Sequence, residues 1–187
     1  MSDIDVESGI RMKHKQFKLA MPLTLLLACA MALGQELSPM PKKARTLADY
    51  KPRSMKEVST ADLKEEISGN EKEKVIVRGD ILPSRVRLRY AGRSRLLPQA
   101  KKDVLYRWAQ LYAGAPEHYT QPYETELLFR EGKTDYWVAV RKQAIAQFKK
   151  EVKNANTVDL YLIRLGWARS GNKWESMLLV EDYQLPK

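Results

Sequence analysis

The chain ends in two long, strongly apolar segments separated by a short polar turn. Residues 157–168 and 174–183 are rich in β-branched, aromatic and other apolar side chains. They predict two long strands, and Gly166 predicts a bulge in the first of them. The preceding residues 142–153 predict a helix, because one helical face carries three apolar side chains: Ile145, Phe148 and Val152. The closing third of the chain therefore predicts helix, strand, strand.

Shorter segments upstream predict three more strands and a second helix. Residues 126–131 and 135–140 predict a hairpin, because Gly132 suits the tight turn between them. Apolar and basic side chains alternate over residues 85–97, as expected of a half-buried strand. Residues 101–113 predict an amphipathic helix. With that helix left out, the order strand, hairpin, helix, strand, strand is that of a small five-stranded, partly open barrel.

Three runs of sequence carry a resemblance: SRVRLRYAGRSRLL, TELLFREGKTDYWVAV and FKKEVKNANTVDLYLIRLGWARSGNKWESMLLVEDYQ. The last resembles the closing helix and two strands of an oligonucleotide/oligosaccharide-binding (OB) barrel. Together, over residues 84–184, the runs resemble a group of uncharacterised small exported bacterial proteins. The resemblance implies an α+β fold, a five-stranded OB-like barrel with one or two helices, over residues 72–187. The helix at 101–113 would be an insertion, and a strand predicted at 74–82 would be additional.

The first 34 residues follow a different pattern, that of a bacterial secretory signal peptide. A basic stretch at 13–18 precedes an apolar run at 19–33, which ends in small residues at Gly34. The apolar run is shorter than the roughly 20 residues that a membrane-spanning helix needs. Residues 1–11 are acidic and do not fit the pattern, so translation is expected to begin at Met12.

Two alternatives remain for this segment. Residues 26–29, Leu-Leu-Ala-Cys, resemble a lipobox, in which Cys29 would be lipidated and would anchor a lipoprotein. The segment could also stay uncleaved as an anchor. Cleavage after Gly34 is favoured, because apolar residues follow Cys29 where a lipoprotein has a polar spacer. This cleavage predicts a periplasmic or secreted protein that contains no cysteine.

Residues 35–71 predict a flexible linker in front of the barrel. Up to about Val58 this segment contains three prolines and few large aliphatic side chains, a composition that does not build a core. Two capping-box patterns, which begin at Ser54 and Ser59, predict one short helix over residues 60–68.

The strongest chemical signal is a row of arginines in the strand predicted at 85–97. The chain is basic, with 33 Lys and Arg against 23 Asp and Glu, and a net charge of +10. Strand geometry places three of these arginines on one side and two more near its turn: Arg85, Arg87, Arg89, Arg93 and Arg95. Guanidinium groups suit phosphate, sulfate and carboxylate. The pattern predicts an anion-binding face, and the alternative is a solvated face whose like charges prevent aggregation.

No pattern of catalytic or metal-binding residues stands out. The mature chain has one histidine, His118, and no nucleophile-elbow, zinc or phosphate-loop motif. Glu124 and Glu126 are expected to be solvated carboxylates. Trp167 and Trp174 flank the last turn and suggest a carbohydrate platform, although core packing is the default for such residues. We therefore expect a protein that is not an enzyme and needs no cofactor or metal.

The expected export of the protein determines which anions its arginines would encounter. Nucleic acid is scarce in the periplasm, so it is disfavoured as a partner, whereas anionic envelope polymers, lipid headgroups and acidic proteins are abundant there. Membrane contact is expected only through the signal segment or a lipid anchor. The expected function is a non-enzymatic binding or accessory module of the bacterial envelope. The alternative is a structural or assembly protein that binds a protein partner through a sheet edge without anion specificity.

Overall fold

The structure is a computed structural model that describes residues 45–70, 72–114 and 116–186 of the 187-residue chain. Met12, Cys29 and the cleavage position after Gly34 lie outside the described residues, so the signal peptide and the lipidation remain predictions. Within the described residues, none of the helices combines the length and the hydropathy that crossing a bilayer requires.

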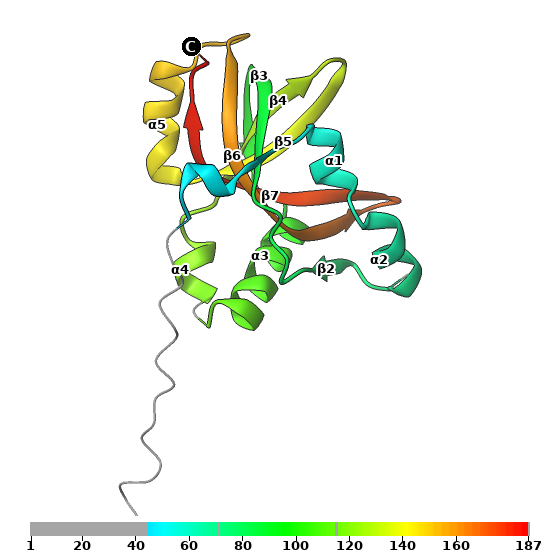
Figure 1. Ribbon diagram of the computed structural model, residues 1–187. Coiled ribbons are helices and arrows are strands. Elements are labelled where there is room, and N and C mark those ends of the chain that lie inside the picture. The colour runs from blue at the N-terminus through cyan, green and yellow to red at the C-terminus, as the bar shows by residue number, and fades with distance from the viewer. Residues whose placement is uncertain (1–44, 71, 115, 187) are drawn as a thin grey trace, which may run out of the picture. The chain divides into compact units, whose positions relative to one another are not determined.

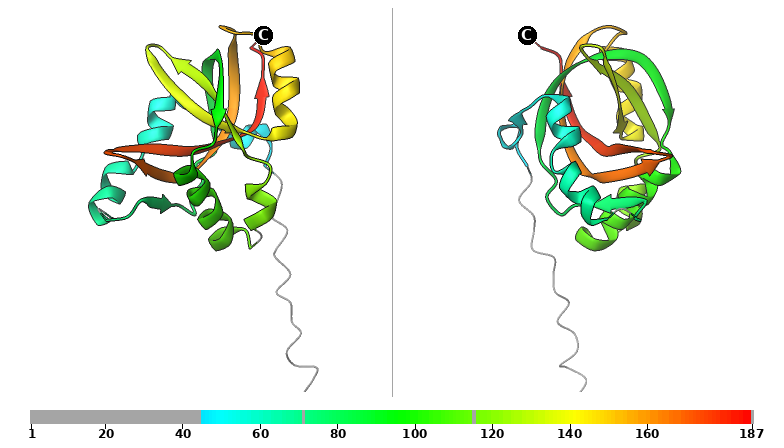
Figure 2. Two further views of the ribbon diagram at one scale, coloured as in Figure 1. Left: turned by 180° about the vertical axis from the view of Figure 1, so that it is seen from behind. Right: turned by 90° about the vertical axis from the view of Figure 1, so that its right-hand side faces the viewer.

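Five strands close into a barrel, and the right-hand view of Figure 2 shows them curving round a common interior. The barrel strands are β3 (Ser84–Leu96), β4 (Thr125–Glu131), β5 (Thr134–Val140), β6 (Thr157–Ser170) and β7 (Lys173–Gln184). Their order is β3-β4-β5-β7-β6, and β3 pairs back to β6. Helix α5 (Lys142–Glu151) connects β5 to β6. This is the strand order and helix placement of an OB barrel, so the expected fold class is confirmed.

The barrel closure is weakest between β5 and β7. These two strands run parallel and pair at a single position, Ala139 with Leu179. The other neighbouring barrel strands are antiparallel and pair over at least five positions each. The first halves of β5 and β7 are therefore not hydrogen-bonded to each other in the sheet.

Two apolar clusters stabilise the domain. The first fills the barrel and is made by the inward-facing side chains of the strands together with α5, for example Leu88, Tyr90, Phe129, Phe148 and Leu160. The second lies on the opposite face of β6 and β7, where α3 (Gln99–Tyr112) packs with residues such as Val104, Leu105, Ile163 and Leu179. Because β6 has one cluster on each face, nearly every one of its side chains from Val158 to Ala168 is buried.

The insertion between β3 and β4 and the additional strand are both present (Figure 1). Helix α3 begins two residues before the expected start at residue 101, and a short helix, α4 (Pro116–Thr120), follows it. Strand β2 (Val75–Val77) is shorter than expected, because its pairing with β6 ends at Gly166.

Gly166 lies at an irregularity in the pairing of β6 with β7, which confirms the bulge expected there. Its φ of +150° is one that L side chains rarely adopt. A Cβ atom at this position would also lie 2.0 Å from the carbonyl oxygen of Ile76 in β2. Glycine is therefore required both by the backbone conformation and by the close approach of β2.

The structure differs from the expected linker over residues 45–70. This segment contains η1 (Leu47–Asp49), β1 (Lys51–Pro52), α1 (Met55–Thr60) and α2 (Leu63–Gly69). Met55 and Val58 of α1 are fully buried in the barrel cluster, and β1 pairs with the start of β3. Two apolar side chains one helical turn apart therefore pack this segment into the barrel core, although its average composition is polar.

Two helices form where one was expected over residues 60–68: α2 covers most of that range, and local capping begins α1 earlier, at Met55. The Ser54 side chain accepts a hydrogen bond from the backbone N–H of Glu57, and the Glu57 carboxylate accepts one from the backbone N–H of Ser54, as the first capping box predicts. Glu131 adds a tertiary cap, since its carboxylate accepts from the backbone N–H groups of Met55 and Lys56 at 2.9 and 3.3 Å. The backbone N–H groups at the start of α1 therefore have carboxylate acceptors both within the helix and from a distant strand.

The other end of α1 is held by Arg164, a fully buried arginine on β6. Its guanidinium donates to the carbonyl oxygens of Val58 and Ala61 at 3.3 and 2.7 Å and forms an ion pair with Asp62 at 3.2 Å. The same guanidinium lies 4.4 Å from the ring centre of Trp167. A cation at the carbonyl end of a helix is favourable, so Arg164 fixes α1 against the barrel.

Candidate functional site

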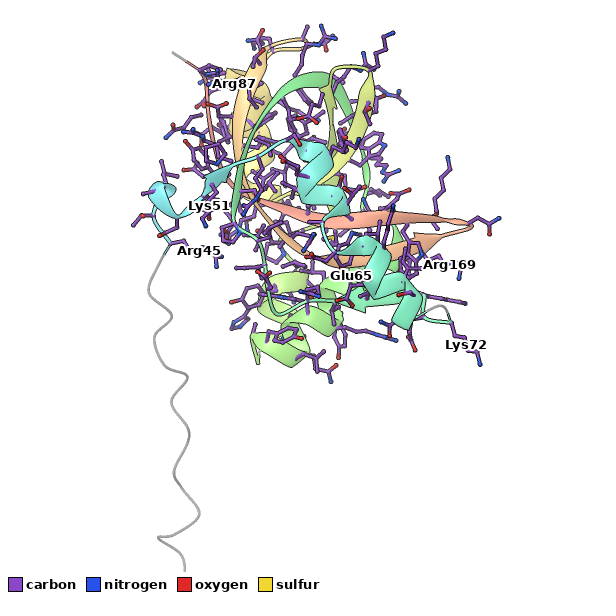
Figure 3. All side chains as sticks on the ribbon, turned by 45° about the vertical axis from the view of Figure 1, so that its right-hand side comes forward. Arg45, Lys51, Glu65, Lys72, Arg87 and Arg169 are labelled. Atoms are coloured by element: carbon purple, nitrogen blue, oxygen red, sulfur yellow. The ribbon has the colours of Figure 1, made fainter. Side chains whose placement is uncertain are left out.

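The row of arginines lies on the outer face of β3, as the alternation predicts. Arg85, Arg87 and Arg89 are exposed, while the residues between them face the barrel core: Val86, Leu88 and Tyr90. Figure 3 shows Arg87 projecting from the barrel. Arg93 follows in an irregular stretch of the strand and is also exposed. We call Arg85, Arg87, Arg89 and Arg93 the basic face.

Arg87 is already paired with a carboxylate from the neighbouring strand. Its Nε and Nη2 atoms donate to the two carboxylate oxygens of Asp159 at 2.7 and 2.8 Å. Asp159 stands directly opposite Arg87 in the β3–β6 pairing. This bidentate hydrogen bonding from Arg87 holds the pKa of Asp159 below its usual value. Arg87 thus brings less net charge to the basic face than its neighbours do.

Arg95 is separate from the basic face. Its guanidinium donates to Glu126 at 2.7 Å and to Glu175 at 3.1 Å. It also lies 4.4 Å from the ring centre of Trp137. With both carboxylates engaged, Arg95 belongs to a group of ion pairs around β4 and β7 rather than to the face expected to meet an anion.

Three arginines of the basic face remain available for a ligand. In the part of the chain that the structure describes, Arg85, Arg89 and Arg93 form no ion pair. Across the sheet, Arg89 stands opposite Arg130 of β4, which is itself paired with Asp135 at 2.7 Å. Cations next to one another repel unless an anion lies between them. The face is therefore an area of unbalanced positive charge.

Helix α5 and the loop after it extend this area with lysines that the strand pattern could not indicate. Lys149 and Lys153 are exposed, and Lys149 Nζ lies 3.4 Å from the hydroxyl of Ser94 on β3. Asn154, the neighbour of Lys153, lies 3.0 Å from the position of a Cβ atom on Gly92. The end of α5 is thus beside the stretch of β3 that carries Arg93. Sequence reasoning missed these lysines because more than 50 residues separate the two elements.

Glu126 is buried rather than solvated, which corrects the expectation for this residue. Its side chain is 1% exposed and accepts a hydrogen bond from Lys101 Nζ at 2.6 Å. The Lys101 side chain is 4% exposed and also lies 3.3 Å from Glu175. Two cations and two carboxylates therefore alternate in one group, which we call the ion-pair cluster: Arg95, Lys101, Glu126 and Glu175.

The suggested platform of Trp167 and Trp174 does not form. Trp167 is fully buried, and its indole N–H donates to the carbonyl oxygen of Ser59 at 2.9 Å. Trp174 is half-buried and stands opposite Arg169 across the β6–β7 pair. Trp167 thus packs in the interior, and only Trp174 of this pair lies at the surface.

The described residues contain no group of three or more His, Cys, Asp or Glu side chains arranged to hold a metal ion. His118 is exposed on the short helix α4. No family model, no curated protein and no solved structure matches the chain.

Proposed function

We propose that this protein is a non-enzymatic exported binding or accessory module of the bacterial envelope, which engages an anionic ligand through the basic face of β3. The observation that carries the proposal is the set of three exposed arginines without an ion pair in the described chain: Arg85, Arg89 and Arg93. The ligand would be an acidic glycan, a lipid headgroup or an acidic protein. The export step rests on the signal-peptide pattern of residues 1–34.

The spacing of these arginines favours an extended anion over a single small one. Arg85 and Arg89 are four residues apart on one strand face, so their Cα atoms are separated by about 13 Å. Between them, Arg87 is neutralised by Asp159. A polymer or a surface that repeats its charges can pair with both free guanidinium groups without the two side chains having to converge on one anion.

Binding to a sheet edge, the alternative function, has less support. The strands at the two ends of the sheet are β1 and β2, which have two and three residues. Short edge strands offer few free backbone groups to a partner strand, and the open first halves of β5 and β7 line one cleft together with the end of α1.

Heparin, a sulfated glycan, is a suitable probe for the proposal. The full chain should bind immobilised heparin and elute with salt, because salt screens exposed charges. The triple variant Arg85→Ala, Arg89→Ala and Arg93→Ala should elute at clearly lower salt. Vesicles that contain phosphatidylglycerol, in a sedimentation assay with the same variant, would show whether lipid headgroups are bound as well.

The matched control removes three exposed lysines from the other end of the domain: Lys64, Lys72 and Lys74. Figure 3 shows Lys72 far from Arg87. Both triple variants lose the same charge, so any difference between them reports position rather than net charge. The proposal is wrong if the two variants elute from heparin at the same salt concentration.

A further inference from the structure

A second candidate site lies at the place where the barrel is weakly closed. A cleft of about 280 Å³ is lined by the first halves of β5 and β7 and by the end of α1. Its aromatic lining comes from Trp137 and Tyr136 of β5 and Trp174 of β7, all half-buried. Helix α1, which lies outside the five barrel strands, completes the wall with Ser59 and Thr60.

The charges around this cleft are balanced. The charged side chains in the lining are Lys101, Asp135 and Glu175. Lys101 and Glu175 belong to the ion-pair cluster, where each carboxylate contacts two cations. Asp135 is paired with Arg130 at 2.7 Å. Neither an anion nor a cation would find an uncompensated opposite charge in this cleft, in contrast to the basic face.

The lining nevertheless combines aromatic faces with hydrogen-bonding groups. Arg95 lies over the ring of Trp137, which fixes the orientation of that ring. The Glu175 side chain is 39% exposed, and its carboxylate has capacity for further hydrogen bonds beside those from Arg95 and Lys101. A purely apolar ligand would cover such polar groups without replacing their hydrogen bonds to water, which is costly.

We propose that this cleft binds one uncharged sugar ring, with Trp137 and Trp174 contacting its C–H groups and Glu175 accepting from its hydroxyl groups. A pyranose presents apolar C–H groups on its faces and hydroxyl donors at its edge, so it matches both parts of the lining. The volume of about 280 Å³ is just below the roughly 300–1,000 Å³ typical of small-molecule sites, which favours a single ring. This site is separate from the basic face, and either one can exist without the other.

A nucleobase is also a flat polar ring, but the cleft is poorly suited to nucleic acid. Sites for single strands combine stacking aromatic residues with a positively charged groove that follows the phosphates. The charged side chains that line this cleft include one cation and two carboxylates: Lys101, Asp135 and Glu175. We therefore favour the sugar, and a nucleic-acid probe becomes one arm of the test.

The four tryptophans allow a test that needs no variant for its first step. In a ¹H–¹⁵N spectrum of the full chain, each indole N–H gives one signal, and the chain has 4 tryptophans. Uncharged tetrasaccharides of glucose (cellotetraose and maltotetraose) and of N-acetylglucosamine (chitotetraose) would be titrated to about 10 mM, above the roughly 1 mM Kd of a weak site. Oligothymidylate would be titrated in parallel.

We expect at least one tetrasaccharide to shift the signals of Trp137 and Trp174 and to leave that of the buried Trp108, which does not line the cleft, unchanged. Trp174→Ala should weaken that binding about tenfold or more, a loss of about 1.4 kcal/mol. Tyr106→Ala, an aromatic side chain of α3 that is 50% exposed, is the control and should have no effect. The inference is overturned if no tetrasaccharide moves the two signals, or if only oligothymidylate does.

Discussion

The burial of Met55 provides the sharpest test of the described fold, because its segment has the composition of a linker. Met55 lies on α1 and is 0% exposed inside the barrel cluster. Replacing it with alanine removes three side-chain heavy atoms from the core. At roughly 0.8 kcal/mol for each methylene-sized group, the lost transfer free energy is about 2.4 kcal/mol. The cavity that remains adds to this loss, so we expect a total of about 3 kcal/mol.

Urea unfolding followed by tryptophan fluorescence measures this change directly. The Met55→Ala variant should unfold at lower urea with an unchanged m value, because the surface exposed on unfolding stays nearly the same. For a domain of this size, about 3 kcal/mol corresponds to a decrease in Tm of roughly 6–12 °C.

Leu96→Ala is the matched control, because Leu96 is a large apolar residue of β3 that is 79% exposed. Its substitution should change the free energy of unfolding by less than about 0.5 kcal/mol. If Met55→Ala destabilises the protein no more than this control does, then α1 is not part of the folded domain and the reasoning fails.

Three further predictions concern ionisable groups. Glu126→Leu should lower the free energy of unfolding by about 3–5 kcal/mol, because it removes a partner of the nearly buried Lys101. Adding Lys101→Met should recover part of that loss. A double variant no more stable than Glu126→Leu would contradict the pairing. Burial, together with a hydrogen bond to a carboxylate, raises the pKa of Tyr50 to about 12, so the unfolded chain loses this proton first and stability should fall as the pH rises from about 10 to 12. Tyr50→Phe should make that fall shallower in urea titrations, and an equally steep fall would argue against the shift. Arg87→Ala should raise the pKa of Asp159 toward its ordinary value in a carboxyl NMR titration, whereas an unchanged pKa would show that the pair does not persist in solution.

Much of the barrel could be predicted because its signals are local. The alternation in β3, the glycine at the tight turn between β4 and β5, and the apolar stripe of α5 each depend on neighbours within one element. The segment before the barrel could not be predicted in the same way. Its composition is polar on average, and the burial of Met55 and Val58 depends on a surface made by strands far along the chain.

The candidate site likewise has one part that the sequence could predict and one part that it could not. Alternation alone predicted that Arg85, Arg87 and Arg89 would face outward. Which of them is free depends on cross-strand register, since the Arg87 partner Asp159 is 72 residues away. The same holds for Arg95, whose partner Glu175 is 80 residues away.

The sequence by itself determined the periodicity of each strand and helix, the order of these elements, and the row of arginines on one strand face. These properties follow from steric and solvation preferences within a few residues. Only the tertiary structure decided which charges are balanced, which tryptophans reach the surface, and which polar segment becomes part of the core. Charge balance and burial depend on which side chains meet across the barrel, and a linear pattern contains no information about that register.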